Sequence, residues 1–271
     1  RLWRLPPAER AQYACTGAVY EFRRSMNSRR HFEYFRSKAL FHETFRKYTG
    51  RQYLYLKTAS QEQFCDWLKR FPVSIAKPNY GMLGRGITRV RSRDWPGTDE
   101  LWRYLQSNRL DLLEEPIAQH PALDALNPSC VNTVRVITVL HRGQVDVIGT
   151  VLRIGVGGLV DNFASGGIAA PVDAASGRVL VPAVGNSFED APHAIHPITH
   201  TPIVGFAVPH WPEVISLACE AATVVPQVRT VGWDIAIGVQ APLLVEGNHD
   251  WCKAWQVPQG QGCLPALQRY M

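Results

Sequence analysis

The amino-acid sequence predicts an α+β fold, in which helices pack on antiparallel sheets. Three observations support this class. Helical periodicity is concentrated near the N-terminus, strand-like runs later occur in pairs with short connections, and these pairs interrupt any regular alternation of strands and helices. Strands joined by a short connection are antiparallel neighbours, whereas a parallel sheet needs a long crossover between its strands. With 271 residues, 46% of them hydrophobic, the chain can bury a sizeable core.

The N-terminal part, residues 8–48, is predicted to be helical. It contains few glycine or proline residues, and its aromatic side chains recur at roughly helical spacing. Gly50 follows as a helix stop. Thr58-Ala-Ser60 precedes residues 61–69 in the manner of a helix cap, so a further short helix is expected there.

Strand patterns begin after residue 70. Residues 71–77 are predicted to form one strand, and residues 86–91 a second strand after a glycine-rich loop. Residues 98–109 have the pattern of a helix, and residues 111–115 that of another strand end.

Two hairpins are predicted in the remainder of the chain. Residues 132–153 contain two alternating runs separated by His141-Arg-Gly-Gln, and residues 231–248 contain two apolar runs with a short connection. Between them, residues 155–210 are rich in glycine, proline and alanine and are expected to be mostly loops. Residues 211–225 are predicted to be helical.

The last hairpin carries three oxygen-bearing side chains. Asp234 lies in its first strand, and Glu246 and Asn248 lie two residues apart in its second strand. Because side chains alternate along a strand, Glu246 and Asn248 point to the same side, where Asp234 can face them. Carboxylate and amide oxygens suit Mg²⁺, which prefers one or two carboxylates together with phosphate oxygens and water. The alternative is an edge hairpin whose acids are simply solvated.

A lysine and three glycines mark the earlier strand pair. Lys77 ends the first strand and precedes a loop that contains Gly81, Gly84 and Gly86. Glycines allow backbone N–H groups to approach a phosphate closely, and the lysine supplies positive charge. The pattern differs from a Walker loop, which opens a helix. It predicts either a flap over phosphates or a plain hairpin turn with an incidental lysine.

The net charge of +6 is unevenly distributed, with most of the excess in residues 1–57. Such a basic face can bind a small anion, nucleic acid or a membrane surface, or it can be solvated helix surface. No nucleic-acid motif accompanies it, and no run reaches the roughly 20 apolar residues of a membrane span, so neither partner is expected. The six cysteines form no C-x-x-C pair and the N-terminus lacks the apolar stretch of a signal peptide. We therefore expect a cytoplasmic protein with reduced thiols. Because the sequence starts at Arg1 and has no start Met, we also expect that the numbered chain begins inside a longer product or has been trimmed.

Taken in order, these features resemble the ATP-grasp superfamily, whose members clamp a nucleotide between two α+β subdomains. Within it, the chain is most similar to the sugar-transfer-associated ATP-grasp family (alpha-L-glutamate ligase-like), over roughly residues 34–257. The segments that carry the resemblance, besides the lysine with its glycine flap and the terminal hairpin, are Glu114-Glu-Pro-Ile117, Asn132-Thr-Val-Arg135, Leu152-Arg153, Val160-Asp161-Asn162-Phe and Gly166-Gly167.

The resemblance implies three parts. Residues 1–57 would be a basic helical N-terminal segment in place of the family's usual N-terminal α/β domain. Residues 58–115 would be a small ATP-grasp subdomain with the glycine flap, and residues 116–271 a large subdomain with the metal site.

The resemblance also implies ATP and Mg²⁺ as cofactors and assigns roles to individual residues. The expected metal ligands are Asp234, Glu246 and Asn248. The expected nucleotide contacts are Lys38, Lys77, Gly81, Gly84, Gly86, Glu114, Glu115 and Ile117, although Lys38 is equally compatible with a surface helix. The expected groups at the reacting phosphates are Arg135, Arg153 and Asn162. His249, which follows a metal ligand, is a candidate for acid–base work on an incoming amine.

The implied function is that of an ATP-dependent carboxylate–amine ligase, which forms an acyl phosphate, releases ADP and makes an amide bond in a biosynthetic pathway with partner enzymes. Its substrates would be a small-molecule carboxylate and an amine. Two alternatives stay open: an ATP-grasp kinase that phosphorylates a hydroxyl, and a catalytically silent module that binds a nucleotide or polyanion. After Asn248 the chain departs from many relatives with His249-Asp-Trp-Cys252, which leaves the acceptor open. The substrates, the oligomeric state and the role of the basic segment are likewise open.

Overall fold

The structure consists of helices and two antiparallel sheets, which confirms the predicted α+β class. The computed structural model describes residues 5–271 except 82–83, 85, 159–160, 162, 164–165 and 187–190. The chain divides into two units: unit 1 comprises Arg1–Phe32 and Gln119–Met271, and unit 2 comprises Glu33–Ala118. These boundaries differ from those of the three parts expected from the family resemblance, which end at residues 57, 115 and 271. The three-part division stays a prediction.

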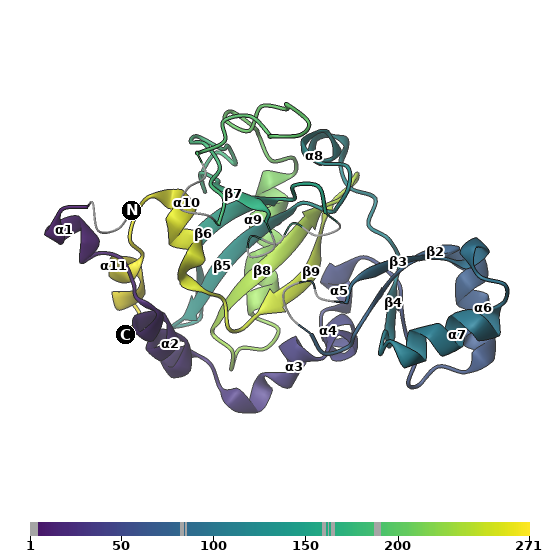
Figure 1. The fold of residues 1–271 in the computed structure, drawn as a ribbon. Coiled ribbons are helices and arrows are strands. Elements are labelled where there is room, and N and C mark those ends of the chain that lie inside the picture. The colour runs from purple at the N-terminus through teal and green to yellow at the C-terminus, as the bar shows by residue number, and fades with distance from the viewer. Residues whose placement is uncertain are drawn as a thin grey trace. The chain divides into compact units, whose positions relative to one another are not determined.

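The described residues of unit 2 form a four-stranded antiparallel sheet in the order β1-β4-β2-β3 (Figure 1). β2 and β3 make the hairpin predicted on either side of the glycine loop. The strands are β1 (Tyr53–Tyr55), β2 (Val73–Lys77), β3 (Thr88–Arg91) and β4 (Leu112–Glu114).

Local sequence signals set the helix ends of unit 2. The Ser60 hydroxyl accepts a hydrogen bond from the Gln63 N–H, and the Gln63 side chain accepts one from the Ser60 N–H, so the predicted cap is a full capping box. Gly50 ends α5 with a φ of 59°, a left-handed conformation that glycine adopts without strain. The helices are α3 (Glu33–Arg36), α4 (Lys38–Thr44), α5 (Arg46–Thr49), α6 (Gln61–Arg70), η3 (Ser92–Asp94) and α7 (Thr98–Ser107).

The core of unit 2 joins its two longest helices to the sheet. Phe64 of α6 and Leu101 and Leu105 of α7 are fully buried together with Leu113 of β4. Burying such a side chain stabilises the fold by about 1.5–3 kcal/mol.

The described part of unit 1 contains a five-stranded antiparallel sheet in the order β7-β6-β5-β8-β9 (Figure 1). Its two long hairpins, β5–β6 and β8–β9, are those predicted from the sequence. The strands are β5 (Thr133–His141), β6 (Gln144–Ile154), β7 (Ile168–Pro171), β8 (Thr230–Ile237) and β9 (Pro242–Asn248).

Helices cover the sheet of unit 1. α9 packs against β5, β6, β8 and β9 and crosses behind the strands in Figure 1. A separate core joins Phe22 of α2 to Ile137 of β5 and to Trp251 and Trp255 of the C-terminal segment. The helices are α1 (Pro7–Arg10), α2 (Thr16–Met26), η2 (Arg29–His31), α8 (Pro121–Leu126), α9 (Trp211–Ala222), η5 (Lys253–Trp255), α10 (Gln256–Gln259) and α11 (Leu264–Gln268). No helix in the described part of the chain is long and apolar enough to cross a membrane.

Two segments differ in detail from the sequence prediction. The helical region 8–48 is broken into short helices, and after α2 Asn27 is extended and pairs with Val228 in an isolated antiparallel bridge. The segment 155–210 contains β7 and further isolated bridges, for example between Val172 and Val179. The pairing of Asn27 with Val228 joins residues far apart in the sequence, which a local sequence pattern cannot relate.

Candidate active site

The β8–β9 hairpin places the three oxygen-bearing side chains together. Asp234 pairs directly with Glu246 across the two strands, and Gly232 pairs with Asn248. Directly opposed residues on antiparallel strands point to the same face, so all three side chains share one face of the sheet. Immediately beyond Asp234 the register shifts, because Ile235 pairs with Leu244 and leaves Val245 as an extra residue in β9.

Asp234 lies in the centre of this group and is almost fully buried, with 3% of its surface exposed. Arg135 of β5 donates to both of its carboxylate oxygens, from Nε and, at 2.8 Å, from Nη2. Arg153 of β6 donates from Nη1 to Asp234 Oδ2 at 2.7 Å. Burial alone would raise the pKa of the Asp234 carboxyl, but Arg135 and Arg153 outweigh it and hold that pKa well below its usual range.

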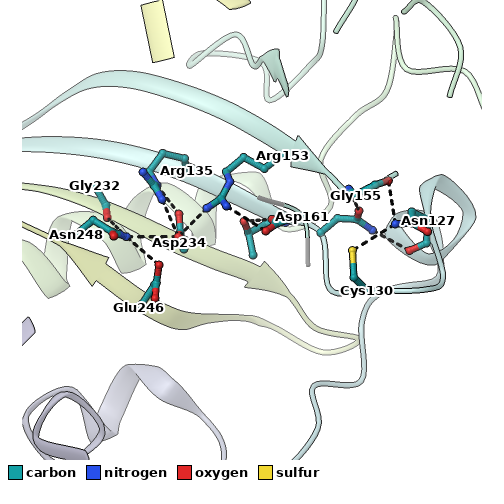
Figure 2. A network of polar contacts seen from close by, with 12 residues as sticks. Asn127, Cys130, Arg135, Arg153, Gly155, Asp161, Gly232, Asp234, Glu246 and Asn248 are labelled. Carbon is teal, nitrogen blue, oxygen red and sulfur yellow. Dashed lines mark hydrogen bonds and ion pairs between the residues drawn. The ribbon is translucent and has the colours of Figure 1, made fainter. Parts of the chain in front are cut away.

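Asn248 connects the two acids. Its Nδ2 lies 3.2 Å from Glu246 Oε1 and 3.4 Å from Asp234 Oδ2, and it also donates to the Gly232 carbonyl at 3.3 Å. Figure 2 shows these contacts as one continuous network with the two arginines. Rotating the amide by half a turn would present its oxygen to the same place, since the two ends of an Asn amide have the same shape.

The donor set fits Mg²⁺. Two carboxylates and one amide oxygen are the hard ligands that this ion takes when phosphate oxygens and water complete its octahedron. Within the described ranges, no group of three or more His, Cys, Asp and Glu side chains is arranged to hold a metal ion. The site would therefore rely on Asn248 and on ligands from a substrate, which is how Mg²⁺ is usually held beside a nucleotide.

A second buried acid extends the network beyond Arg153. Asp161 Oδ1 lies 3.2 Å from Arg153 Nη2. The other oxygen, Oδ2, accepts the Thr133 N–H at 2.9 Å and the Thr133 hydroxyl. Burial raises the pKa of Asp161, against the effect of Arg153. The result is an alternating row of acids and bases from Asp161 to Arg135 (Figure 2).

His249 follows Asn248 and is held by the N-terminal segment. Its ring stacks on Phe32 with the centroids 4.0 Å apart and the planes 9° from parallel. Its carbonyl oxygen accepts a hydrogen bond from Asn27 Nδ2 at 3.0 Å. The basic segment thus reaches the end of β9, which the sequence did not indicate.

The lysines assigned to the nucleotide lie in unit 2. Lys77 Nζ forms an ion pair of 2.6 Å with the buried carboxylate of Glu114, which Arg51 Nη2 also approaches at 3.4 Å. Lys38 Nζ donates to the Gly81 carbonyl at 3.0 Å. The side chain of Glu114, a residue that the family resemblance assigns to the nucleotide, is in this structure a counter-ion of Lys77.

The remaining assigned residues are placed as follows. Glu115 Oε2 accepts the Gln52 N–H at 3.0 Å, and Ile117 is half-buried. Gly84 and Gly86 of the loop have φ values of 68° and 76°. Asn162 lies outside the described residues.

Sequence reasoning missed three residues of the network. Asp161 and Thr133 lie within segments that carry the family resemblance, but no role was assigned to either residue from the sequence. Gly232 is required because a side chain there would meet Trp251 Cβ at 2.9 Å and Arg135 Cδ at 3.1 Å, so the Arg135 side chain passes close to the Gly232 backbone. A glycine inside an apolar strand is itself a signal of such a close approach.

Solved structures share this architecture. The ATP-grasp ligase PsnB complexed with a minimal precursor is 15% identical, with a TM-score of 0.54, over 94% of this chain and 68% of its own. PsnB complexed with precursor peptide PsnA2 and AMPPNP is 14% identical, with a TM-score of 0.51, over 94% and 65%. The ADP complex of PurK, an N5-carboxyaminoimidazole ribonucleotide synthetase, is 12% identical, with a TM-score of 0.50, over 93% and 58%. The fold is therefore an ATP-grasp fold.

The sequence defines the class more closely. Residues 101–270, which are more than half of the chain, match the sugar-transfer associated ATP-grasp family, and the chain belongs to that family. No curated protein matches it by sequence. The chain spans 58% to 68% of the length of the three solved structures described above.

Proposed function

We propose that the chain is an ATP-dependent ligase that activates a carboxylate as an acyl phosphate and joins it to an amine, with Mg²⁺ as its metal. One observation carries the proposal: the register of β8 and β9 sets Asp234, Glu246 and Asn248 on one face, with two arginines on Asp234. Phosphoryl transfer is catalysed mainly by positioning and by stabilising charge on the transferred group. Oxygen ligands beside guanidinium groups provide both.

The residues of unit 1 would divide the work. Mg²⁺, when bound, would neutralise charge on the phosphoryl oxygens. Asp234, Glu246 and Asn248 would hold it, while Arg135 and Arg153 would bind the oxygens of the γ-phosphate and the acyl phosphate. Asn162 is assigned to the transferred group on the family resemblance. His249, whose position is fixed by Phe32 and Asn27, is proposed to accept the proton of the incoming amine.

Unit 2 would bind the nucleotide. Lys38 and Lys77 are proposed to contact its phosphates, and the backbone of residues 114–117 to pair with adenine. The glycine loop would exclude water, which matters because water hydrolyses an acyl phosphate. The buried Glu114 supports the role of Lys77, since an anionic partner keeps the ammonium group charged and oriented.

The solved relatives support the nucleotide and leave the substrates open. PsnB was captured with AMPPNP and a precursor peptide, and PurK with ADP. For this chain we propose a small-molecule carboxylate and amine, an ADP-forming reaction and a cytoplasmic location.

The first test is thermal unfolding with Mg-ATP. A ligand present at about 100 times its Kd stabilises the folded state by about 2.7 kcal/mol. We expect such a shift for the wild type, and loss of its metal-dependent part in Asp234→Asn/Glu246→Gln. The control, Asp173→Asn/Glu213→Gln, removes the same charges from the surface of unit 1 and should keep the shift. If neither the wild type nor the control responds to Mg-ATP, the nucleotide assignment is wrong.

The second test separates a ligase from a kinase. Hydroxylamine traps an acyl phosphate as a hydroxamate and does not react in this way with a phosphate ester. Candidate carboxylates should therefore give hydroxamate and ADP in equal amounts. ADP formation with a phosphorylated hydroxyl and no hydroxamate would establish the kinase alternative instead.

A further inference from the structure

Arg153 lies between two buried carboxylates and uses a different nitrogen for each. Nη1 donates to Asp234 Oδ2 at 2.7 Å, and Nη2 lies 3.2 Å from Asp161 Oδ1 (Figure 2). One guanidinium therefore bridges an expected metal ligand and an acid that has no assigned role.

Asp161 is fixed independently of the arginine. Its Oδ2 accepts both the N–H and the hydroxyl of Thr133, the first residue of β5. The side chain is buried, with 8% of the residue exposed. An acid anchored to a strand in this way keeps its position when one of its partners moves.

Asp234 Oδ2, by contrast, already has two basic partners. It accepts hydrogen bonds from Arg135 Nη2 at 2.8 Å and from Arg153 Nη1 at 2.7 Å, which together occupy both of its lone pairs. A metal ion bound at this oxygen would therefore displace one of the two arginine nitrogens. The two-point contact of Arg135 is the stronger one, because bidentate guanidinium–carboxylate pairs gain from two parallel hydrogen bonds. The bond from Arg153 Nη1 is therefore the one to be released.

We propose that Asp161 is a positioning residue that retains Arg153 when Asp234 takes a metal ion, so that Nη1 becomes available to a phosphoryl oxygen. This role rests on the proposed function. In it, Asp161 links metal binding at Asp234 to the availability of Arg153 for the phosphoryl group. Arg153 would pivot between its two acids without leaving the site.

The net charge of the network is consistent with the release of Arg153 Nη1 from Asp234 to a phosphoryl oxygen. Asp161, Asp234 and Glu246 carry three negative charges, against two positive charges on Arg135 and Arg153. A divalent cation would convert this excess of one negative charge into an excess of one positive charge, which suits a polyphosphate. Although burial lowers the pKa of Arg153, Asp161 and Asp234 raise it by more, so the guanidinium stays charged throughout.

The test measures how strongly metal and nucleotide binding are coupled. The Kd of ADP is determined by calorimetry in EDTA and again in MgCl₂, and the ratio of the two values reports the coupling. In Asp161→Asn the arginine would keep Asp234 as the remaining one of its two ion-pair partners, which opposes metal binding. We expect the ratio to fall about tenfold or more, the size of one lost charge-assisted hydrogen bond, while the Kd in EDTA stays within about twofold of the wild type.

A matched control is present on the surface of the same unit. Asp173 accepts the N–H of Ser176 at 2.8 Å and its hydroxyl at 2.6 Å, the same pair of donors that Asp161 takes from Thr133. Asp173→Asn should leave the coupling ratio unchanged. Arg153→Lys provides a second measurement, since a lysine cannot bridge both acids, and adding Asp161→Asn to it should reduce the ratio no further.

The outcomes distinguish a failure of the role of Asp161 from a failure of the proposed function. A wild-type ratio well above one that is unchanged by Asp161→Asn overturns the role of Asp161 and leaves the proposed function intact. A parallel loss of binding in EDTA and in MgCl₂ means that Asp161 is merely structural. A wild-type ratio near one overturns both proposals. If Asp161→Asn does not fold, Thr133→Val, which removes one anchor of Asp161, should lower the ratio in the same direction, and an unchanged ratio there overturns the role.

Discussion

Glu114 is the most heavily engaged acid of unit 2. Its Oε1 lies 2.6 Å from Lys77 Nζ, 3.4 Å from Arg51 Nη2 and within hydrogen-bond distance of His42 Nε2. Burial would raise the pKa of Glu114, but Arg51 and Lys77 outweigh it and hold the pKa well below the ordinary value. The carboxylate is therefore both a partner for Lys77, the lysine proposed to contact the nucleotide, and a source of stability.

This arrangement sets the direction of a pH dependence. Because the pKa is lower in the folded state, Glu114 stabilises the fold fully above its unfolded pKa of about 4.3, and this contribution is lost as the pH falls through the folded value. We expect Glu114→Gln to lower the free energy of unfolding by about 3–5 kcal/mol at pH 7, since it leaves buried cations unpaired. The difference from the wild type should be constant down to about pH 5 and should narrow below it.

Urea denaturation at a series of pH values measures this difference. Glu62→Gln, which changes an exposed glutamate of the same unit, serves as the control and should show little effect at any pH. A difference between wild type and Glu114→Gln that grows on acidification would contradict the assigned direction of the pKa shift.

At the scale of elements, one asparagine joins three segments of unit 1. Asn27 caps the end of α2, and its amide accepts the Thr230 N–H at 2.9 Å and donates to the carbonyls of Thr230 and His249. It is buried, with 5% of its surface exposed. The start of β8 and the end of β9 are thus tied to the N-terminal segment by a single side chain.

Asn27→Ala should therefore destabilise unit 1. The substitution leaves buried backbone groups without a partner, and each such group costs about 1–3 kcal/mol. We expect a fall of at least that size in the free energy of unfolding by urea. Asn108→Ala removes an exposed amide with one hydrogen bond, to the Tyr104 carbonyl at 2.8 Å, and should change stability by less than about 0.5 kcal/mol. Equal effects of the two variants would show that the Asn27 bonds do not stabilise the fold.

The elements that could be predicted are those with a local signal. Alternation and short connections identified the β5–β6 and β8–β9 hairpins, and Ser60 and Gly50 marked helix ends. The bridge from Asn27 to Val228 could not be predicted, because its partners are some two hundred residues apart and neither has a distinctive pattern.

The sequence predicted only part of the candidate site, as it predicted only part of the fold. The spacing of Asp234, Glu246 and Asn248 indicated a shared face, and the strand pairing places them there. Arg135 and Arg153 were assigned by family resemblance, and their attachment to Asp234 was not foreseen. That attachment depends on the pairing of three strands and on the missing side chain at Gly232, whose place the Arg135 side chain takes, and these are properties of the folded sheet.

At the scale of the whole molecule, the two units have separate hydrophobic cores. The core of unit 2 contains Phe64 and the core of unit 1 contains Phe22, and both side chains are fully buried. A buried Phe→Ala substitution costs about 3–5 kcal/mol, which is a large part of the stability of a small domain.

We expect each substitution to act within its own unit. Hydrogen exchange of Phe64→Ala should show faster exchange in β2, α6 and α7, with β5 and β8 unchanged. Phe22→Ala should show faster exchange in β5 and β6, with α6 and α7 unchanged. Loss of protection throughout the chain in either variant would mean that the two units unfold as one cooperative body.

The extra residue in β9 has a consequence for how this site can change over time. Strand faces alternate with a period of two, so Leu244 and Glu246, which are two residues apart, would share a face in a regular strand. In this hairpin they pair with Ile235 and Asp234, which are adjacent and face opposite sides, and the bulge at Val245 accommodates the difference. Removing Val245 would leave the same pairs in a regular ladder and keep all three oxygen ligands on one face. A relative of this chain can therefore have one residue fewer before Glu246 and retain the metal site, and a comparison of sequences that requires a fixed spacing from the apolar run would miss it.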